Sequence, residues 1–233
     1  MVVDPAEPRM PPVGLDIAAT ATHVVWDAEH SVVLPPFTLA TGERMAVVDP
    51  SGSGKSTLAQ LVVRFVDPAV GRVSLDGVDY RDLDRDDLYA RIGYIDDDPH
   101  IFASTLVENV RFARPGATDE EVEAALRAAA LGETIERLPR GLDTRLGDGF
   151  VGLSGGERAR MAVARSFLAD QGVLVCDEVV AHLDSVTADQ VAREIFTAPP
   201  GGRVRSVVWV SHTTAGLDLA DRVVSVQAQQ WGK

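Results

Sequence analysis

The nonapeptide from Asp49 to Thr57, which reads Asp-Pro-Ser-Gly-Ser-Gly-Lys-Ser-Thr, constrains the fold of this chain most strongly. The apolar run 44–48 precedes it, and residues 58–65 follow with apolar positions at helical spacing. A glycine-rich turn between a strand and a helix aims backbone N–H groups and the positive end of the helix dipole at an anion. The lysine and the hydroxyl that follow it suit phosphate oxygens and Mg²⁺. The nonapeptide therefore predicts a phosphate-binding loop, and its flanks make a ligand-free glycine/serine turn the weaker alternative.

One position departs from the phosphate-loop pattern, because Asp49 stands where a glycine is usual. A carboxylate near a polyanion, and the loss of glycine's backbone freedom, are expected to weaken the site. Lys55 is one of only two lysines, the other being Lys233, and a compact ammonium suits phosphates better than a planar guanidinium. The expected nucleotide contacts in the loop are Ser51, Gly52, Ser53, Gly54, Lys55, Ser56 and Thr57, with Ser56 also a ligand of Mg²⁺.

Bulk composition narrows the class of protein. A chain of 233 residues suits one large domain, or a domain with a subdomain. It has no run of about 18–20 apolar residues, as a membrane span requires. Cys176 is the only cysteine, so no internal disulfide forms, and a net charge of −13 disfavours a nucleic-acid partner. These features, with an acidic, proline-rich start, are typical of a cytosolic chain.

Periodicity predicts an α/β core interrupted by a mainly helical segment. Residues 1–20, which contain four prolines, are expected to be a linker, and residues 21–233 the folded domain. The expected strands cover 24–26, 31–34, 37–39, 44–48, 71–77, 92–95, 172–176 and 206–210. The expected helices cover 58–65, 86–91, 119–131, 155–169 and 187–196.

Two further groups of polar residues follow apolar runs. The strand at 173–176 ends in Asp177, which can orient the shell of a Mg²⁺ ion, and in Glu178, which can polarise an attacking water. His212 follows the strand at 206–210, where an imidazole can contact a terminal phosphate. Taken alone, each group is better read as the polar end of a core strand. The phosphate loop upstream favours the functional reading.

The segment Leu153-Ser-Gly-Gly-Glu157 opens the helix 155–169 and makes a second helix start suited to an anion. A chain with one lysine loop does not need two such sites for one nucleotide. The simplest explanation is that this helix binds a nucleotide held by a partner subunit. A serine-capped helix start without a ligand is the alternative.

Together these motifs resemble the nucleotide-binding domain of an ATP-binding cassette (ABC) transporter over residues 22–228. The resemblance implies a phosphate-loop NTPase fold of the ABC type. Its mixed sheet core is flanked by helices, with a small antiparallel β subdomain and a helical signature subdomain at about 97–168. ATP and Mg²⁺ are the implied cofactors, and Glu178, His212 and Asp97 the implied catalytic residues. The implied metal ligands are Ser56, Asp97 and Asp177.

The remaining nucleotide contacts also come from the resemblance. They are the signature residues Leu153, Ser154, Gly155, Gly156 and Glu157, the loop residue Asp184, and Trp26 stacked on adenine. Residues 102–109 and 141–144 are similar to exporters. His212 with 216–218 and 96–102 resembles one half of the heterodimeric cysteine/glutathione exporter needed for cytochrome bd assembly. The arginine-rich, lysine-poor composition suggests an actinobacterial type.

The expected function is ATP binding and hydrolysis that powers export at the cytoplasmic face of the plasma membrane. The partners are a transmembrane domain and a second nucleotide-binding domain in head-to-tail pairing, with no nucleic acid. Asp49, and Asp97 at a position where the family has glutamine, favour a different chain as the second domain. They also leave open a weakly or non-hydrolysing regulatory subunit. A DNA-maintenance ATPase of the same family needs a long coiled coil that is absent here.

Overall fold

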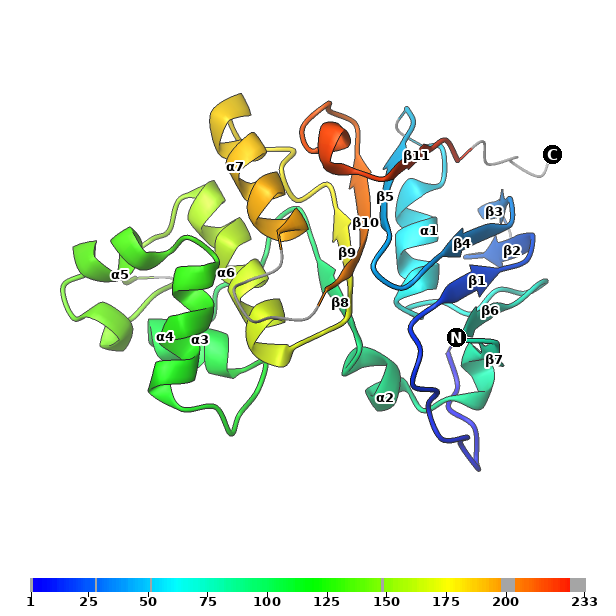
Figure 1. Cartoon of the computed structure of the whole chain (residues 1–233), viewed down its shortest axis with the longest axis horizontal. Coiled ribbons are helices and arrows are strands. Elements are labelled where there is room, and N and C mark those ends of the chain that lie inside the picture. The colour runs from blue at the N-terminus through cyan, green and yellow to red at the C-terminus, as the bar shows by residue number, and fades with distance from the viewer. Residues whose placement is uncertain (1, 28, 51, 148, 198–203, 227–233) are drawn as a thin grey trace. The chain divides into compact units, whose positions relative to one another are not determined.

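The structure is a computed structural model that describes residues 2–27, 29–50, 52–147, 149–197 and 204–226 (Figure 1). The chain forms two compact units. The first unit contains residues 1–94, 172–177 and 204–233, and the second contains residues 95–171 and 178–203. The helical subdomain expected at about 97–168 lies in the second unit, which also includes the later segment 178–203.

The first unit is built on a five-stranded sheet with the order β11-β5-β10-β9-β8. The strands are β5 (Arg44–Val48), β8 (Ile92–Ile95), β9 (Val173–Asp177), β10 (Ser206–Ser211) and β11 (Arg222–Val224). The pairs β10–β5, β10–β9 and β11–β5 are parallel. Every residue of β9 and β10 is buried, which explains why both strands read as continuous apolar runs. Helix α1 (Lys55–Val62) packs against β9 and β10 (Figure 1).

A second, antiparallel sheet in the first unit has the order β4-β1-β6-β7. Its strands are β1 (Ile17–Ala19), β4 (Phe37–Leu39), β6 (Val73–Leu75) and β7 (Val78–Asp79), and a separate hairpin joins β2 (Thr22–Val25) to β3 (Ser31–Leu34). The short elements η1 (Tyr80–Asp82), α2 (Arg85–Tyr89) and η3 (Leu217–Leu219) complete the unit. The predicted antiparallel β subdomain and mixed α/β core are therefore confirmed.

The prediction that residues 1–20 form a linker is wrong for the segment that contains β1. Ile17 is 1% exposed, and β1 pairs with both β4 and β6. The residues before it are also attached, since the buried Arg64 donates to the Val3 carbonyl and Arg85 pairs with Asp4. The four prolines of this segment indicated a linker, because proline disfavours strands, but all four lie outside β1.

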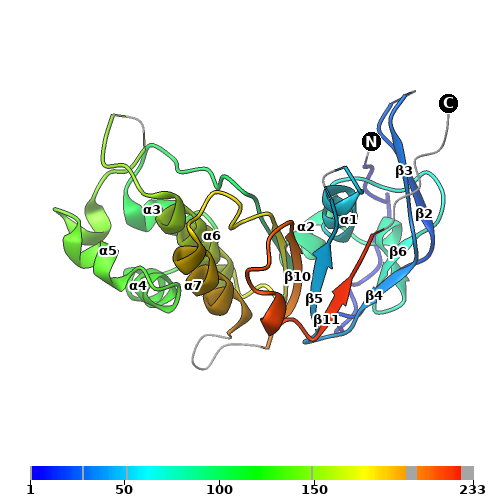
Figure 2. The ribbon, with the colours of Figure 1, turned by 90° about the horizontal axis from the view of Figure 1, so that it is seen from above.

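The second unit is helical. It contains α3 (Leu106–Arg111), α4 (Asp119–Ala128), α5 (Gly132–Arg137), η2 (Gly141–Asp143), α6 (Gly155–Ala169) and α7 (Ser185–Phe196). Helix α6 lies at the centre and packs against α3, α4 and α7 (Figure 2). Capping boxes at Thr118 and Ser154 fix the starts of α4 and α6. Val122, Leu126 and Met161 are fully buried, so the apolar stripes of these helices form core, as predicted.

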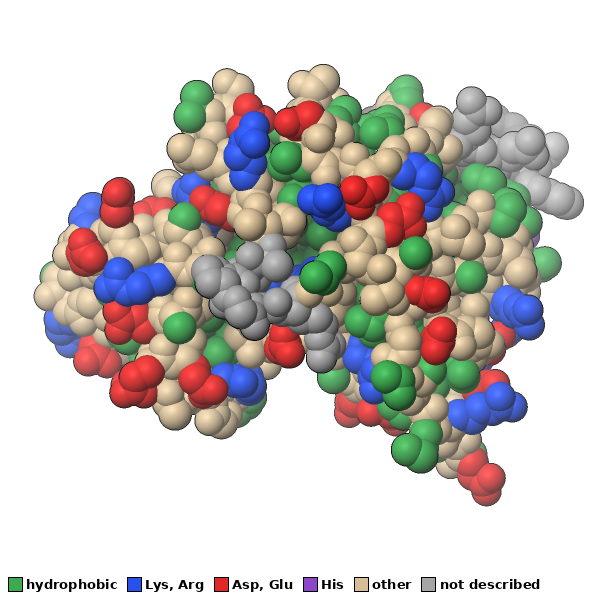
Figure 3. All heavy atoms as spheres, in the orientation of Figure 1, with side chains coloured by type: hydrophobic (Ala, Val, Ile, Leu, Met, Phe, Trp, Pro, Cys, Tyr) green, Lys and Arg blue, Asp and Glu red, His purple; other side chains and the backbone are tan. Residues whose placement is uncertain are grey.

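Acidic and basic side chains are interspersed over both units on the face that Figure 3 shows. Within the described ranges, no helix combines the length and the apolar character that crossing a bilayer requires.

Candidate nucleotide-binding site

The phosphate loop connects β5 to α1 in the first unit, as the sequence predicts. Gly52 and Gly54 have φ angles of 81° and 95°, in the left-handed region where a side chain is disfavoured. Gly54 is also the N-cap residue of α1, so the glycines turn the backbone directly into the helix start. Ser51, a predicted nucleotide contact, lies outside the described residues.

Polar groups of the loop fit a phosphate. Lys55 is 4% exposed, and its Nζ donates to the carbonyl oxygens of Asp49 at 2.7 Å and Pro50 at 3.1 Å. The Ser53 hydroxyl is buried and has no hydrogen-bond partner among the described residues. A buried hydroxyl without a partner is costly, and a phosphate oxygen held in the loop would satisfy it. The next hydroxyl, on Ser56, is exposed.

The carboxyl ends of β5, β9 and β10 meet at one edge of the parallel sheet, where open α/β sheets bind ligands. This register brings Asp177, 6% exposed at the end of β9, beside the phosphate loop. The Ser56 hydroxyl donates to Asp177 Oδ1 at 3.5 Å, and the Tyr94 hydroxyl donates to Oδ2 at 3.1 Å. Sequence reasoning missed Tyr94. Its place near the end of the strand beside β9 was the available signal.

The donor set fits Mg²⁺ only in combination with a nucleotide. Among the described residues, no three carboxylate, imidazole or thiol groups gather closely enough to hold a metal ion. Mg²⁺ is commonly bound by one or two protein oxygens together with substrate phosphates. Ser56 and Asp177 are the oxygen donors that would hold the ion. It would neutralise phosphate charge when bound.

Glu178 follows Asp177 directly and has a φ of 54°, which is unusual for a residue with a side chain. Residues in this conformation cost about 1–3 kcal/mol and cluster at functional sites. The Ala181 N–H donates to the Glu178 carbonyl at 2.9 Å and closes a tight turn. The chain therefore bends sharply at the residue predicted to act as the catalytic carboxylate.

His212 is the first residue after β10 and is exposed. The loop around it is held on both sides. The buried Trp209 donates its indole N–H to the Ala215 carbonyl at 3.0 Å, and the Thr213 N–H donates to the Ser211 hydroxyl at 3.0 Å. Because β10 and β9 are parallel neighbours, His212 emerges at the same edge of the sheet as Asp177.

Trp26, predicted to stack on adenine, lies after β2 in the first unit and is 47% exposed. Its backbone N–H donates to the His30 carbonyl at 2.9 Å in the turn of the hairpin. The indole is therefore open to solvent, which an aromatic platform for a base requires.

The second unit carries the signature segment at the start of α6. The Glu157 N–H donates to the Ser154 hydroxyl at 3.3 Å, and Glu157 Oε2 accepts from the Ser154 N–H at 2.9 Å. Glu157 Oε1 accepts from the Thr134 hydroxyl and from Arg137. Burial raises the pKa of Glu157, but the bonds from Ser154 and Thr134 outweigh it and leave the pKa lowered. The Ser154 hydroxyl accepts in the cap and also interacts with the Glu157 carboxylate, so the start of α6 is held by a closed pair of bonds.

Close packing explains the signature glycines. A Cβ on Gly156 would lie 2.7 Å from Thr187 Cγ2, and one on Gly155 would lie 3.2 Å from Leu183 Cδ2. The first turn of α7 therefore excludes a side chain at Gly156, and Leu183 in the loop before α7 leaves little space at Gly155. Asp184 caps α7 by accepting from the Val186 and Thr187 N–H groups, each at 3.1 Å. The bonds with Thr187 lower the pKa of Asp184, so its carboxylate stabilises the helix start.

Asp97 lies in the second unit, in the loop after β8. Its Oδ2 is 3.5 Å from Nε2 of His182, a residue of the loop before α7. The neighbouring Asp96 has a raised pKa, chiefly because it is partly buried and also because Asp97 and Asp98 add negative charge. The predicted role of Asp97 at a metal or catalytic site stays a prediction.

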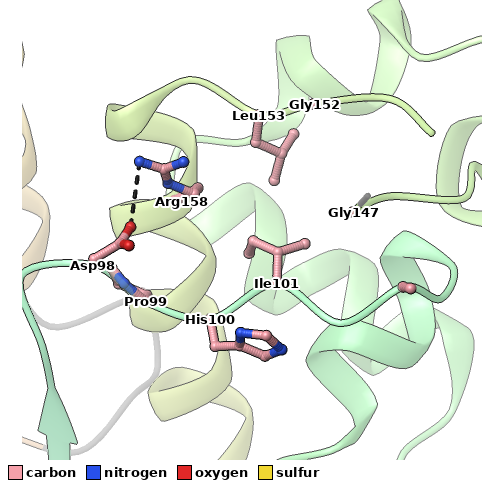
Figure 4. Close-up of a pocket in the computed structure, with 9 residues that line it drawn as sticks. Asp98, Pro99, His100, Ile101, Gly147, Gly152, Leu153 and Arg158 are labelled. Carbon is pink, nitrogen blue, oxygen red and sulfur yellow. Dashed lines mark ion pairs between the residues drawn. The ribbon is translucent and has the colours of Figure 1, made fainter. Parts of the chain in front are cut away.

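A pocket of about 530 Å³ lies beside the signature segment in the second unit. Leu153 and Gly152 line one side, and Pro99, His100 and Ile101 line another (Figure 4). Asp98 and Arg158 form an ion pair of 3.3 Å across its edge. The loop after β8, which contains Asp98, and the start of α6 thus both line this pocket.

The family model of the ABC transporter matches residues 35–181, which include the phosphate loop, the signature segment and Asp177-Glu178. The chain belongs to the ABC transporter family. Within that family, it is 38% identical over 191 residues to the mitochondrial iron-sulfur clusters transporter ATM1 of Kluyveromyces lactis. The match covers 82% of this chain and 26% of that protein.

Other relatives of this ABC ATPase domain differ in the molecule that their names give as transported and in the direction of transport. The mycobactin import ATP-binding/permease protein IrtB of Mycolicibacterium thermoresistibile is 41% identical, over 82% of this chain and 33% of that protein. The ATP-dependent lipid A-core flippase of Burkholderia pseudomallei is 39% identical, over 82% of this chain and 31% of that protein. The chain spans about a quarter to a third of the length of these relatives.

The fold matches the solved structure of a bacterial Atm1-family ABC exporter with ATP bound. The TM-score is 0.86 and the identity 32%, over 97% of this chain and 39% of that one. The predicted fold class is confirmed by this match. The finer resemblance to the cysteine/glutathione exporter stays a prediction.

Proposed function

We propose that this chain binds Mg-ATP and hydrolyses it to drive transport through a membrane-embedded part. The observation that carries the proposal is the phosphate loop, where the Ser53 hydroxyl has no partner in the described part of the chain. This hydroxyl and the buried Lys55 lie at the sheet edge that also holds Asp177. Lys55 and the loop N–H groups would bind phosphates. Ser56 and Asp177 would hold Mg²⁺, and Glu178 would accept a proton from the attacking water.

We further propose head-to-tail pairing with a second nucleotide-binding domain. Among the described residues, the helix starts at Gly54 and at Ser154 are both suited to an anion, although the phosphate loop alone accounts for one nucleotide. In a head-to-tail pair, the signature of one domain closes the ATP site of the other. Trp26 and Asp184 would complete the nucleotide contacts, from the base and from the partner's side respectively.

Nucleotide-dependent association tests the pairing. Glu178→Gln keeps the shape of the side chain and removes its basicity, so ATP is bound but not cleaved. We expect this variant to form dimers in Mg-ATP, by itself or with its partner domain, as measured by analytical ultracentrifugation. The added change Ser154→Ala, which retains the phosphate loop, should reduce association. Equal association of the two variants would contradict a role for the signature in pairing.

The transmembrane partner and the location are proposals of the same kind. IrtB is named an ATP-binding/permease protein, and the chain matches only about a third of its length, which supports a membrane part outside this sequence. We place the domain at the cytoplasmic face of the plasma membrane, where ATP is available. The segments 96–102 and 216–218 support the cysteine/glutathione exporter as the transporter type.

A second candidate is an ATP-binding regulatory subunit with slow or no hydrolysis, in a transporter with two different nucleotide-binding domains. Asp97 supports it, since a charged and shorter side chain replaces the family's glutamine and pairs with His182. Phosphate release by the chain alone, and again with membranes that contain its partner, separates the two candidates. Release in neither preparation would favour the regulatory subunit.

A further inference from the structure

The side chain of Asp49 is hydrogen-bonded to two residues that follow β11, the strand at one edge of the five-stranded sheet. Its Oδ1 accepts from the Ser225 hydroxyl at 2.8 Å, and its Oδ2 accepts from the backbone N–H of Val226. Both partners belong to the segment that follows β11, and Val226 is 2% exposed within the hydrophobic core cluster. The carboxylate is therefore bonded to the end of the described chain.

Strand register explains why an aspartate suits this position. β11 runs parallel to β5, and Val224 is the last residue of β11 to pair, opposite Val47. Two residues later, β5 has given way to the phosphate loop, and the Val226 N–H needs an acceptor that is not a strand carbonyl. The Asp49 carboxylate supplies it. A glycine at this position would leave a buried N–H without this bond, at substantial cost.

The backbone of the same residue contacts the loop lysine. Lys55 Nζ donates to the Asp49 carbonyl, while the Asp49 carboxylate holds Ser225 and Val226. One residue thus connects the phosphate-binding ammonium to the C-terminal edge. If phosphates draw Lys55 away from the Asp49 carbonyl, the change acts on Asp49, whose carboxylate is hydrogen-bonded to Ser225 and Val226.

We propose that Asp49 is a positioning residue, a latch that couples the phosphate loop to residues 225 and 226. It builds on the ATP-binding function proposed above. In this arrangement the aspartate that replaces the usual glycine makes a structural connection. Its negative charge is stabilised by hydrogen bonds from Ser225 and Val226. The hydrogen bonding of residues 225 and 226 and the binding of ATP are then linked in both directions.

Two substitutions separate the latch from a simple charge effect. Asp49→Asn removes the charge but keeps the shape and one carbonyl acceptor, whereas Asp49→Gly removes both acceptors. If the carboxylate acted by repelling phosphates, both changes would tighten ATP binding. The latch predicts that Asp49→Asn leaves ATP affinity within about twofold, and that Asp49→Gly does not tighten it.

Hydrogen exchange at the Val226 amide gives a readout that does not depend on ATP binding. Loss of a hydrogen bond to a charged acceptor corresponds to about tenfold or faster exchange, which we expect for Asp49→Gly. Ser225→Ala, which removes only the hydroxyl partner, should give a smaller increase. Mg-ATP should change Val226 exchange in the natural chain and leave it unchanged in Asp49→Gly.

Unchanged Val226 exchange in Asp49→Gly would overturn the latch, as would severalfold tighter ATP binding by Asp49→Asn. Failure of the natural chain to bind ATP would instead refute the proposed function. In that case the exchange of Val226 without nucleotide still decides whether the latch exists.

Discussion

Tyr94→Phe tests the geometry around Asp177 most sharply, because it removes one hydroxyl and leaves the ring in place. The ring of Tyr94 packs edge-on against Phe65 with centroids 5.3 Å apart, so the phenylalanine keeps this contact. The hydroxyl donates to Asp177 Oδ2, and Asp177 is only 6% exposed. The substitution therefore removes the hydrogen bond from Tyr94 to a buried carboxylate.

The expected magnitude follows from that bond. A hydrogen bond to a charged group contributes about 1.5–3 kcal/mol. The 3.1 Å length and the second donor, Ser56, place this one at the low end, so the free energy of unfolding should fall by about 1–2 kcal/mol. Without the bond, the carboxylate turns away from Ser56 more readily. The Mg²⁺ concentration for half-maximal nucleotide binding should then rise by about 3–10-fold, since 1.4 kcal/mol is tenfold.

Denaturant unfolding measures the first effect, and fluorescent-nucleotide titration over a Mg²⁺ series measures the second. Tyr89→Phe is a matched control, because Tyr89 also packs edge-on against Phe65, at 6.0 Å. In EDTA the nucleotide affinity of Tyr94→Phe should equal that of the natural chain. A Mg²⁺ requirement within twofold of the natural chain, together with unchanged stability, would refute the assignment of Tyr94.

Three further substitutions probe packing, caps and charge. Trp209→Phe leaves a void and an orphaned Ala215 carbonyl, so it should lower the free energy of unfolding by about 1–3 kcal/mol and slow ATP turnover more than it weakens ATP binding. Asp170, the C-cap residue of α6, has a left-handed backbone conformation that glycine adopts without strain. Asp170→Gly should therefore raise the free energy of unfolding by about 0.5–1 kcal/mol, seen as a higher melting temperature. Folding lowers the pKa of Glu157 below its ordinary value of 4.5, so the ionised carboxylate stabilises the fold at pH values above 4.5. This contribution is lost as the pH falls through the folded pKa. Glu157→Gln should therefore be less stable near pH 7 and flatter in a stability profile at acidic pH. Identical profiles would contradict the assigned bonds.

Much of the fold could be predicted from periodicity, and the exceptions have physical causes. Strands β5 and β8 and helix α6 have the predicted bounds, because their apolar pattern and caps agree. Helix α1 begins at Lys55, earlier than the apolar spacing indicates, since the glycine turn feeds directly into it. The short helices α3 and α5 were missed because six residues carry little periodic signal.

The site was predictable in its residue types and less so in its contacts. Strand ends identified Asp177 and His212, because parallel strands bring their carboxyl ends together. The partners of Asp49 were not predictable. Ser225 and Val226 lie 176 and 177 residues away in sequence and reach Asp49 only through the pairing of β11 with β5. The bond from Tyr94 to Asp177 depends likewise on the order of strands in the sheet.

Phosphate release from Mg-ATP tests whether this chain is an ATPase with Glu178 as its catalytic carboxylate. Release is measured for the natural chain and for Glu178→Gln, each with its membrane partner. We expect Mg²⁺-dependent release by the natural chain. Release should be lost in Glu178→Gln while ATP binding is retained, and ATP binding should be lost in Lys55→Ala. Equal release by the natural chain and Glu178→Gln would refute the proposed ATPase.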